Sequence, residues 1–536
     1  MSEPIPDAVI VGAGAGGAAM AWSLCRAGWQ VLLLERGPDH AREDYQPDEI
    51  SVLREGFLQP DQGAFHWVST GADGSSPFPS TLGWTASCVG GGTVHMGGFL
   101  YRFHPVDFRM RSIMGDVPDL ADWPFSYQDL EPYYQTAEGL IGVAGDGSTR
   151  YVPRSGPHPL PPLAAHPLSE RLRETCTTMG LAPFVTPRAV NSIAYQGRPA
   201  CQYCDACAGY GCPIGAKGSA QETLVRSALR TGRLQLRTGM VASEICLDRT
   251  GKADAVICID RESRQSLRFR GRHIIVSCSA VESARLLLLS RSGRYPDGLG
   301  NDNGLVGRHL QFHGTTFGSA RLERLGDWHP FLNLSVADYY LGGEGLGGLP
   351  KGGMLRFDML GRLPLRRALD FLGRQPAPLW GEQLVADLRR ELGDFDRIEY
   401  EAFHDYLPSP GTWVGLDEGR LDGYGLPSAH IRLDSCALRR RSGELLAERA
   451  AEILGRLGAD DIVHDAVGAT SSYLVHGSCR AGDDPETSVL DPWCRVHAVP
   501  NLHVVDGSFM PTSGGASPTL TIVANALRVG HHLVKS

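Results

Sequence analysis

Three glycines and one acid near the start of the chain have the types and spacing of a dinucleotide-binding site. Gly12, Gly14 and Gly17 follow an apolar run, and Glu35 ends the next apolar run, 18 residues after Gly17. The first glycine permits a tight turn, the second lets the backbone approach a pyrophosphate, and the third lets helix and strand pack closely. The helix N-terminus adds free N–H groups and a favourable dipole. We therefore predict a nucleotide site in which Glu35 accepts hydrogen bonds from an adenosine ribose.

The chain also places four of its thirteen cysteines within twelve residues. Their spacing, C-x2-C-x2-C-x4-C-P, is similar to the ferredoxin run C-x2-C-x2-C-x3-C-P with one added residue. Thiolates spaced in this way on a loop can converge on iron, so an iron–sulfur cluster is one hypothesis. A structural thiol or disulfide knot and a zinc site are the alternatives. The candidate ligands are Cys201, Cys204, Cys207 and Cys212.

The glycine motif requires a strand–helix–strand unit to position it. Apolar runs predict strands at 8–11 and 31–34, with a helix at 18–27 between them. Further elements of the same half are expected later in the chain: strands at 234–247, 254–260 and 273–277, and helices at 280–289 and 519–534. These elements predict a Rossmann-like α/β domain.

Residues 315–465 have no nucleotide-type pattern. Strand-like runs alternate there with charged helical patterns: strands at 315–321, 397–403 and 428–433, and helices at 380–392 and 438–457. We interpret this region as a substrate-binding domain built on a sheet. The predicted fold class is therefore α/β, with a Rossmann-like domain and a second, sheet-based α+β domain.

Length and composition narrow the class of protein. A chain of 536 residues predicts two joined domains. The net charge of −9 and the lack of a basic stretch argue against nucleic acid as a partner. No run reaches about 18 consecutive apolar residues, so we expect no membrane span. The N-terminus lacks signal-peptide features, and an odd number of mostly scattered cysteines is atypical of a secreted disulfide framework. A cytoplasmic location is expected.

Over nearly its whole length the sequence resembles the glucose–methanol–choline (GMC) flavoprotein oxidoreductases. The resemblance lies in ordered blocks at compatible spacings: the glycine motif through Glu35, and residues 90–102, 122–124, 275–277, 282–287, 298–301, 306–308, 477–480, 488–491, 504–507 and 517–522. It implies FAD bound in an extended form and oxidation of an alcohol or sugar hydroxyl by hydride transfer to flavin N5. It also implies an FAD-binding domain of residues 1–48, 201–314 and 466–536. Residues 49–200 and 315–465 would form the substrate-binding domain and segments that cover FAD.

The resemblance also assigns cofactor contacts by position. Gly12, Gly14 and Gly17 meet the pyrophosphate, and Glu35 the ribose. The other implied contacts are Gly91, Gly92 and Thr93 along the flavin end, Val241 at adenine, Asp506 and Gly507 at the pyrophosphate and ribityl chain, and Pro518 and Thr519 near the isoalloxazine. In one pyranose-oxidising branch a histidine in the context of His95 bonds covalently to the flavin. Because Met96 rather than tryptophan follows here, we favour a histidine that packs beside the flavin.

The catalytic positions depart from the family pattern. The family places a histidine three residues before the glycine of its Gly-Thr/Ser motif, where this chain has Leu474. It places histidine or asparagine before the C-terminal Pro-Thr, where this chain has Ser517. His476, directly before Gly477, is the nearest candidate for a general base. The alternative is that His476 only bonds the nearby backbone, and Ser517 could hydrogen-bond a substrate oxygen.

Three functions remain open at this point. The leading one is FAD-dependent oxidation of a primary or secondary hydroxyl of a small alcohol, sugar or aminosugar, with O2 or another electron acceptor. The altered catalytic positions are also compatible with a non-redox lyase or isomerase. The cysteine run is compatible with an electron-passing dehydrogenase that contains an iron–sulfur cluster. One family branch oxidises the 6′-hydroxyl of aminoglycosides, and an acidic enzyme suits such a cation. The many arginines and glycines suggest a bacterial coding bias, which fits secondary metabolism. The sequence does not indicate an oligomeric state.

Overall fold

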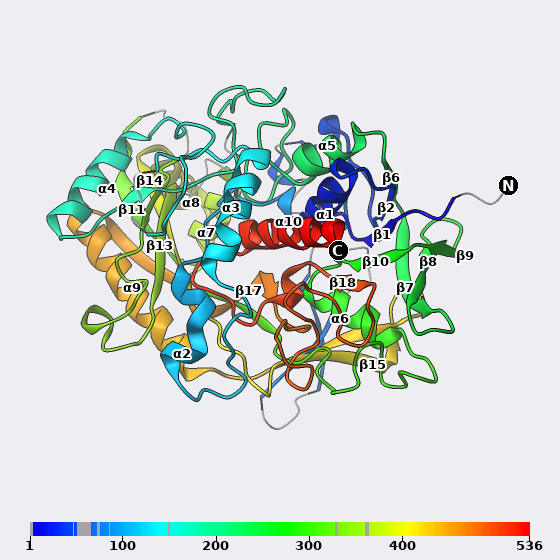
Figure 1. Ribbon diagram of the computed structural model, residues 1–536. Helices are drawn as coiled ribbons and strands as arrows, with labels where there is room; N and C mark the ends of the chain where they lie inside the picture. Colours follow the sequence, from blue (N-terminus) through cyan, green and yellow to red (C-terminus); the bar gives the residue numbers. More distant parts are fainter. Residues whose placement is uncertain are drawn as a thin grey trace.

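The structure is a computed structural model of the chain, shown in Figure 1. It describes residues 4–46, 48–50, 66–71, 76–84, 86–147, 151–204, 206–326, 331–359 and 364–536. The predicted covering segment 49–200 therefore extends partly outside the described residues. Within the described residues, four sheets are linked by helices, and their strands come from widely separated parts of the sequence.

A five-stranded parallel sheet carries the glycine motif. Its strands, in the order β18-β10-β1-β2-β6, are Leu502–Val504, His273–Val276, Ala8–Val11, Val31–Leu34 and Leu234–Arg237. Most of these strands are continuous apolar runs, as expected where helices cover both faces of a parallel sheet. The order of the strands reverses between β1 and β10, and in such sheets ligands bind at the carboxyl ends of the strands beside the reversal.

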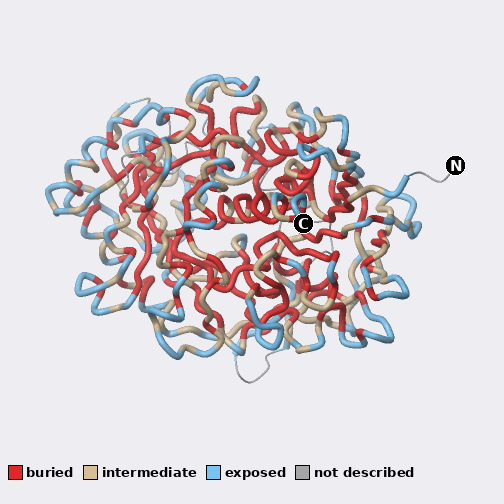
Figure 2. The backbone as a smooth tube through the Cα atoms, viewed as in Figure 1, coloured by how far each residue is buried: buried red, intermediate tan, exposed pale blue. Residues whose placement is uncertain are grey.

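Two long helices pack on each other, and the first of them also packs on this sheet. Helix α1, Ala15–Arg26, follows β1 directly, and α10, Thr519–Lys535, lies alongside it (Figure 1). The two helices approach closely at Gly530, where an added Cβ would lie only 2.6 Å from the Ser23 hydroxyl. The backbone of α10 is buried over most of its length (Figure 2), which explains its nearly continuous apolar sequence. The other helices of this half are α6, Ala280–Leu289, and α5, Arg226–Leu229, after a π-helical turn at Gln221–Val225.

A small antiparallel sheet lies at the outer edge of the nucleotide-binding half (Figure 1). It contains β7, Met240–Leu247, β8, Ala253–Asp260, and β9, Ser266–Arg270. The predicted strand 234–247 is therefore wrong as a single element. A turn with Gly239 at φ +74° divides it, so β6 joins the parallel sheet and β7 pairs with β8.

The second half is built on a six-stranded sheet. The predicted strands at 315–321 and 397–403 belong to it, but the predicted strand at 428–433 lies in another sheet, where it pairs with residues 66–70. The order of the six-stranded sheet is β17-β11-β14-β13-β12-β5, with bounds Asp460–His476, Gln311–Glu323, Phe395–His404, Gly353–Met359, Leu334–Val336 and Phe184–Val185. Two helices, α9 (Ala437–Leu457) and α4 (Pro167–Thr178), pack on one face and bury an apolar cluster there. The predicted domain boundaries at 314/315 and 465/466 fall inside β11 and β17, which pair with each other.

The other face of this sheet is polar. Neighbouring strands place Thr315 beside Phe403, Phe317 beside Glu401, and Ser319 beside Glu399 on that face. The end near Phe403 packs against the loop before α10, and α7 (Pro364–Gly373) and α8 (Gly381–Gly393) lie at the far end. The sheet therefore presents charged side chains towards the nucleotide-binding half.

The remaining elements link the two halves. A fourth sheet contains β15, Trp413–Leu421, β16, Pro427–Leu433, β3, His66–Thr70, and β4, Phe78–Ser80. Helices α2, Met110–Met114, and α3, Tyr127–Ile141, connect the second glycine cluster to the rest of the chain. Among the described helices, none is long and apolar enough to cross a membrane.

Candidate active site

The glycine motif forms the turn between β1 and α1. Gly12 has φ +96°, which favours glycine, and a side chain on Gly17 would overlap the carbonyl oxygen of Gly12. Gly14 differs because a Cβ there would meet no atom within 4 Å. It caps the N-terminus of α1, whose first turn contains no acidic residue. The crevice above Gly14 therefore has open space and free N–H groups suited to a phosphate.

Glu35 ends β2 and lies buried beside this turn, with 7% of its surface exposed. Its Oε2 accepts a hydrogen bond from the Ala13 N–H at 2.8 Å, and its Oε1 accepts one from the Gly37 N–H at 2.9 Å. Burial raises its pKa, and these N–H groups act in the opposite direction. Each carboxylate oxygen still has acceptor capacity for a ribose hydroxyl. Val241 lies near Glu35, because the N–H of the preceding Met240 donates to the Glu35 carbonyl at 2.9 Å.

The second glycine cluster lies against the first. The Gly90 N–H donates to the Ala13 carbonyl at 2.9 Å, and a Cβ on Gly91 would lie 3.1 Å from the Gly14 Cα. Gly92 is exposed, and the nearest atom to a Cβ there is the His95 Nε2 at 3.9 Å. The crevice between the two loops therefore has room above Gly92 for a flat ring.

Thr93 and Asp506 use their side chains to hold the walls of the crevice. The Thr93 hydroxyl donates to the Gly90 carbonyl at 2.6 Å and accepts from the Ala220 N–H at 2.8 Å. The Asp506 carboxylate accepts from the N–H groups of Ser508 and Ser279 at 2.9 and 3.1 Å. Both residues would therefore meet a cofactor mainly through their backbone.

The residues around the crevice fit FAD in three respects. Space is open at Gly14 and Gly92, and neither α1 nor α10 has an acid in its first turn. Buried hydroxyls of Ser277 and Ser279, after β10, have no hydrogen-bond partner among the described residues. Pro518 and Thr519 begin α10, and Gly507 packs against the end of β17. These groups would hold the extended cofactor between the two halves.

His95 lies beside Gly92 with its ring stacked on Trp84. The ring centroids are 5.9 Å apart at 19°, and the exposed ring of Tyr473 meets the edge of His95 at 6.3 Å. Burial, with a smaller effect of Lys217, lowers the pKa of His95 to about 4. The ring is therefore neutral at pH 7 and is positioned to pack beside a flavin.

His476 ends β17 and is completely buried. No hydrogen bond of normal geometry reaches either ring nitrogen from the described residues, although the Phe312 backbone lies close enough to favour the protonated ring. The His313 ring meets the His476 ring edge-on at 5.9 Å and 82°. Burial and His313 lower the pKa of His476 well below its usual value. Leu474, at the family's usual histidine position, packs against the main core instead. A neutral imidazole with one basic nitrogen is therefore present in this chain two residues further on.

Ser517 ends a buried loop, 511–516, that hydrogen bonds fix on several sides. Its own surface is 7% exposed, and no described residue hydrogen-bonds to its hydroxyl. Bonds of 2.7–2.9 Å join the loop to its surroundings: Gln311 to the Pro511 carbonyl, Trp123 to the Thr512 hydroxyl, Tyr406 N–H to the Ser513 hydroxyl, Gly515 N–H to the Tyr340 hydroxyl, and His313 to the Ala516 carbonyl. His313 contacts both the Ala516 carbonyl and the His476 ring, so one buried side chain links the loop before Ser517 to His476.

A buried ion-pair network supports this loop and could not be identified from the sequence. Tyr340 donates to Asp107 at 2.6 Å, Lys351 lies 2.5 Å from the other oxygen of that carboxylate, and Lys351 also pairs with Asp405. Lys351 and Asp107 are almost completely buried. These residues are scattered over 300 positions of the chain and form no motif, so only the fold brings them together.

The cysteine run lies on a loop attached to the flavin-facing segment. The Lys217 ammonium donates to the carbonyls of Met96, Cys207 and Tyr210 at 3.0, 2.8 and 2.6 Å. All thirteen cysteines are free, so the disulfide alternative for Cys201, Cys204, Cys207 and Cys212 is wrong. Within the described residues no group of three or more His, Cys, Asp or Glu side chains could hold a metal ion. Burial raises the pKa of Cys201 to about 12, which disfavours the thiolate. The iron–sulfur and zinc hypotheses gain no support from this geometry.

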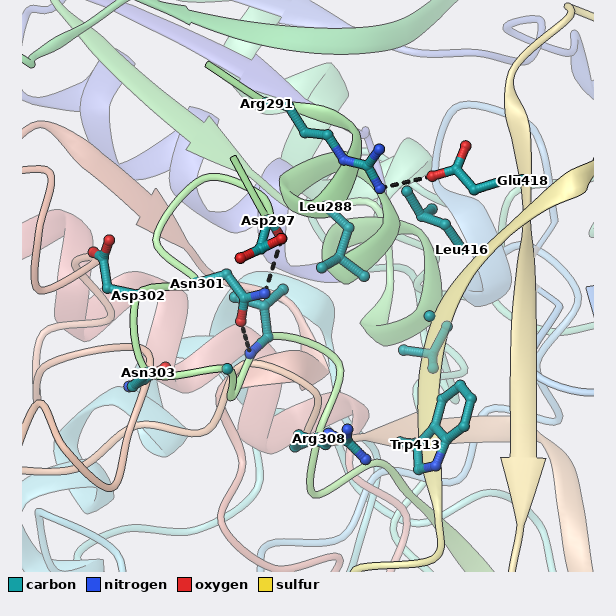
Figure 3. A pocket seen from close by; sticks show the side chains of 14 residues that line it. Leu288, Arg291, Asp297, Asn301, Asp302, Asn303, Arg308, Trp413, Leu416 and Glu418 are labelled. Carbon is teal, nitrogen blue, oxygen red and sulfur yellow. Dashed lines mark hydrogen bonds and ion pairs between the residues drawn. The ribbon is translucent and has the colours of Figure 1, made fainter. Parts of the chain in front are cut away.

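A separate surface pocket of about 740 Å3 lies between loop 297–308 and β15 (Figure 3). None of the predicted site residues lines it. Two of its polar side chains already have partners: Arg291 pairs with Glu418 at 2.7 Å, and both ends of the Asn301 amide bond to its own loop. We therefore place the candidate active site in the crevice between the two halves, not in this pocket.

Comparison with known proteins identifies the family. Models for GMC oxidoreductases match residues 67–315 and 443–526, and a model for NAD(P)-binding Rossmann-like domains matches residues 10–41. The chain belongs to the GMC oxidoreductase family. As a GMC oxidoreductase, it has the predicted α/β two-domain fold with FAD as its cofactor, and it acts on CH–OH groups.

Similar proteins support the same class. This GMC oxidoreductase is 36% identical to paromamine 6′-oxidase from Streptomyces fradiae, over 97% of this chain and 90% of that protein. It is 34% identical to 6‴-hydroxyparomomycin C oxidase from Streptomyces lividus, over 98% and 91%. A formate oxidase structure from Aspergillus oryzae has the same fold, with a TM-score of 0.68, 15% identity, and coverage of 99% of this chain and 98% of that one. The predictions of family, fold class and oxidation of a hydroxyl to a carbonyl are confirmed.

Proposed function

We propose that this GMC oxidoreductase is an oxidase of a primary hydroxyl on an aminosugar, of the class found in paromamine. The observation that carries the proposal is the full-length similarity to two oxidases whose names specify aminoglycoside substrates. A cationic substrate also suits the net charge of −9. Since both relatives are named oxidases, O2 is the proposed electron acceptor.

In this proposal His476 is the general base and Ser517 orients the substrate. When bound, FAD supplies the hydride acceptor. Burial keeps the His476 ring neutral at pH 7, so its single unprotonated nitrogen can accept the proton of the substrate hydroxyl as the hydride leaves. The Ser517 hydroxyl can donate to the same oxygen, which would orient the C–H bond for transfer to the bound cofactor.

The polar face of the six-stranded sheet offers recognition for an ammonium group. Along β14, Glu401 lies about 7 Å and Glu399 about 14 Å beyond Phe403, at about 3.4 Å per residue. Arg356 binds Glu401 at 2.7 Å, whereas the Glu399 carboxylate has no side-chain hydrogen bond within the described part of the chain and lies 3.7 Å from Arg366. Burial raises the pKa of Glu399, and a substrate ammonium would offset that cost. Glu399 is therefore the proposed partner of a substrate amino group.

Anaerobic mixing of the holoenzyme with candidate substrates tests this function. Paromamine should bleach the flavin absorbance rapidly, and an equal concentration of glucose should not. Admission of O2 should then restore the oxidised spectrum and consume oxygen. Bleaching by neutral sugars but not by aminosugars would contradict the proposed substrate class. Bleaching without reoxidation by O2 would contradict the oxidase assignment and leave the substrate class intact.

A further inference from the structure

His313 lies between the two proposed catalytic residues: it contacts the His476 ring and the backbone of Ala516, the residue before Ser517. It lies near the start of β11 and is completely buried. Its Nε2 lies 2.9 Å from the carbonyl oxygen of Ala516, the residue before Ser517, and its Nδ1 lies 3.0 Å from the His404 carbonyl. Its ring also meets the His476 ring edge-on at 5.9 Å. No other described side chain bonds to the Ala516 carbonyl.

We propose that His313 is a positioning residue that sets Ser517 through the Ala516 carbonyl. This proposal rests on the catalytic roles proposed for Ser517 and His476. The loop before Ser517 is held at two adjacent residues. The Gly515 N–H donates to the Tyr340 hydroxyl, and the Ala516 carbonyl is bound by His313. Two adjacent bonds from the substrate-binding half therefore fix the direction in which Ser517 leaves the loop.

The surroundings of His313 leave the ring little freedom to turn. The Phe403 ring is tilted against it at 5.3 Å, and a Cβ on the neighbouring Gly314 would already touch the His404 ring. The charged groups that act on His313 are Lys351 and Asp107, whose effects on its pKa are opposite. Burial dominates and lowers the pKa of His313 to about 4, so the ring is neutral at pH 7.

A neutral imidazole has one N–H, so His313 donates fully to only one of its two carbonyl neighbours. Two amide variants separate these bonds. His313→Gln places an N–H near the position of Nε2 and keeps the donor to Ala516. His313→Asn places an N–H near the position of Nδ1 and keeps only the donor to His404. If positioning acts through Ala516, the two variants differ in kcat although each removes the same ring.

The test is a double-mutant cycle on the holoenzyme with Ser517→Ala, measuring kcat, KM, FAD content and thermal midpoint. We expect His313→Asn to lower kcat by about 100-fold, the scale of a 1 Å misplacement, with KM little changed. We expect the fall in kcat of His313→Gln to be about tenfold smaller than that of His313→Asn. In the Ser517→Ala background the loss from His313→Asn should nearly disappear, because residues that act as a unit are not additive. A purely structural role would instead give losses that multiply in the double variant.

Each other outcome has one meaning. Losses that multiply, or equal losses in His313→Asn and His313→Gln, overturn the positioning role. If His313→Asn does not fold, a loss above about tenfold in well-folded His313→Gln also overturns it. If Ser517→Ala retains full kcat, the proposed catalytic role of Ser517 has failed, and the inference about His313 fails with it. If Ser517→Ala is impaired and His313→Asn is not, only the inference about His313 fails.

Discussion

Gly14 and Gly17 lie three residues apart, yet the structure predicts opposite consequences for an added methyl group. The Gly14 backbone has φ −74° and ψ −164°, which any residue can adopt, and no atom lies within 4 Å of its Cβ position. As a helix N-cap, Gly14→Ala should cost the fold about 0.5–1 kcal/mol. In Gly17→Ala the methyl overlaps the Gly12 carbonyl and lies 3.3 Å from the Ile10 side chain, so overpacking should cost about 1–3 kcal/mol.

FAD binding should be affected more by Gly14→Ala, although that variant is the less destabilising of the two. The methyl group of Gly14→Ala points into the crevice where the pyrophosphate must approach the backbone, so we expect FAD affinity to fall at least about tenfold, or 1.4 kcal/mol. FAD titration of deflavinated protein measures this loss, and thermal melting of the same protein measures stability. Gly139→Ala, on helix α3, is the matched control, because the space around an added Cβ is equally open there. It should leave FAD affinity unchanged and should not lower the thermal midpoint. Unchanged FAD affinity in well-folded Gly14→Ala would refute the location of the cofactor.

Three further predictions concern the active-site loop, the substrate and pH. Tyr340→Phe leaves the Gly515 N–H without its acceptor. Denaturant unfolding should therefore show a free energy of unfolding lower by about 1–3 kcal/mol, and kcat should fall. An unchanged free energy of unfolding and kcat would mean that this bond does not hold the loop. Glu399→Gln should raise KM for an aminosugar but not for a neutral analogue, and equal effects on both would remove Glu399 from ammonium recognition. Stability should fall as pH drops from about 6.5 towards 4, because buried histidines with pKa values lowered to about 3–4 bind protons only after unfolding. Thermal midpoints that stay flat over this range would contradict the burial of His313, His404 and His503.

The nucleotide-binding half was largely predictable because its signals are local. The glycine turn, the apolar run of 273–276 and the helix at 280–289 each follow from a short stretch whose pattern permits one conformation. The merged strand at 234–247 failed because its two halves have similar apolar patterns, and only Gly239 marks the turn between them. Sheet membership depends on which distant strand is available, and a single sequence does not contain that information.

The substrate-binding half was less predictable for the same physical reason. Strand β17 runs for 17 residues and pairs irregularly with β11, so its pattern has no clean alternation to mark its start. The Asp107–Lys351–Asp405 network is invisible in the sequence, because each member is an ordinary charged residue until the fold buries it. His313 belongs to no sequence motif, and its contact with Ala516 depends wholly on tertiary structure.

The candidate site itself was predicted from family positions, and its geometry adds the physical context. His476 was chosen for its place beside Gly477, and the structure puts its unpaired ring in the same buried cluster as the loop that carries Ser517. The roles of both residues remain proposals. The cysteine run was the strongest local signal outside the glycine motif, and its thiols are free and form no group of potential metal ligands.

The central claim is that His476 is the base that removes the hydroxyl proton. Its most direct test is anaerobic stopped-flow mixing of paromamine with the wild-type holoenzyme and with His476→Asn, following the flavin absorbance under saturating substrate. We predict that His476→Asn binds FAD normally and is reduced about 100- to 10,000-fold more slowly, the usual contribution of a general base. Reduction of His476→Asn at the wild-type rate, with the same FAD content, would contradict the account.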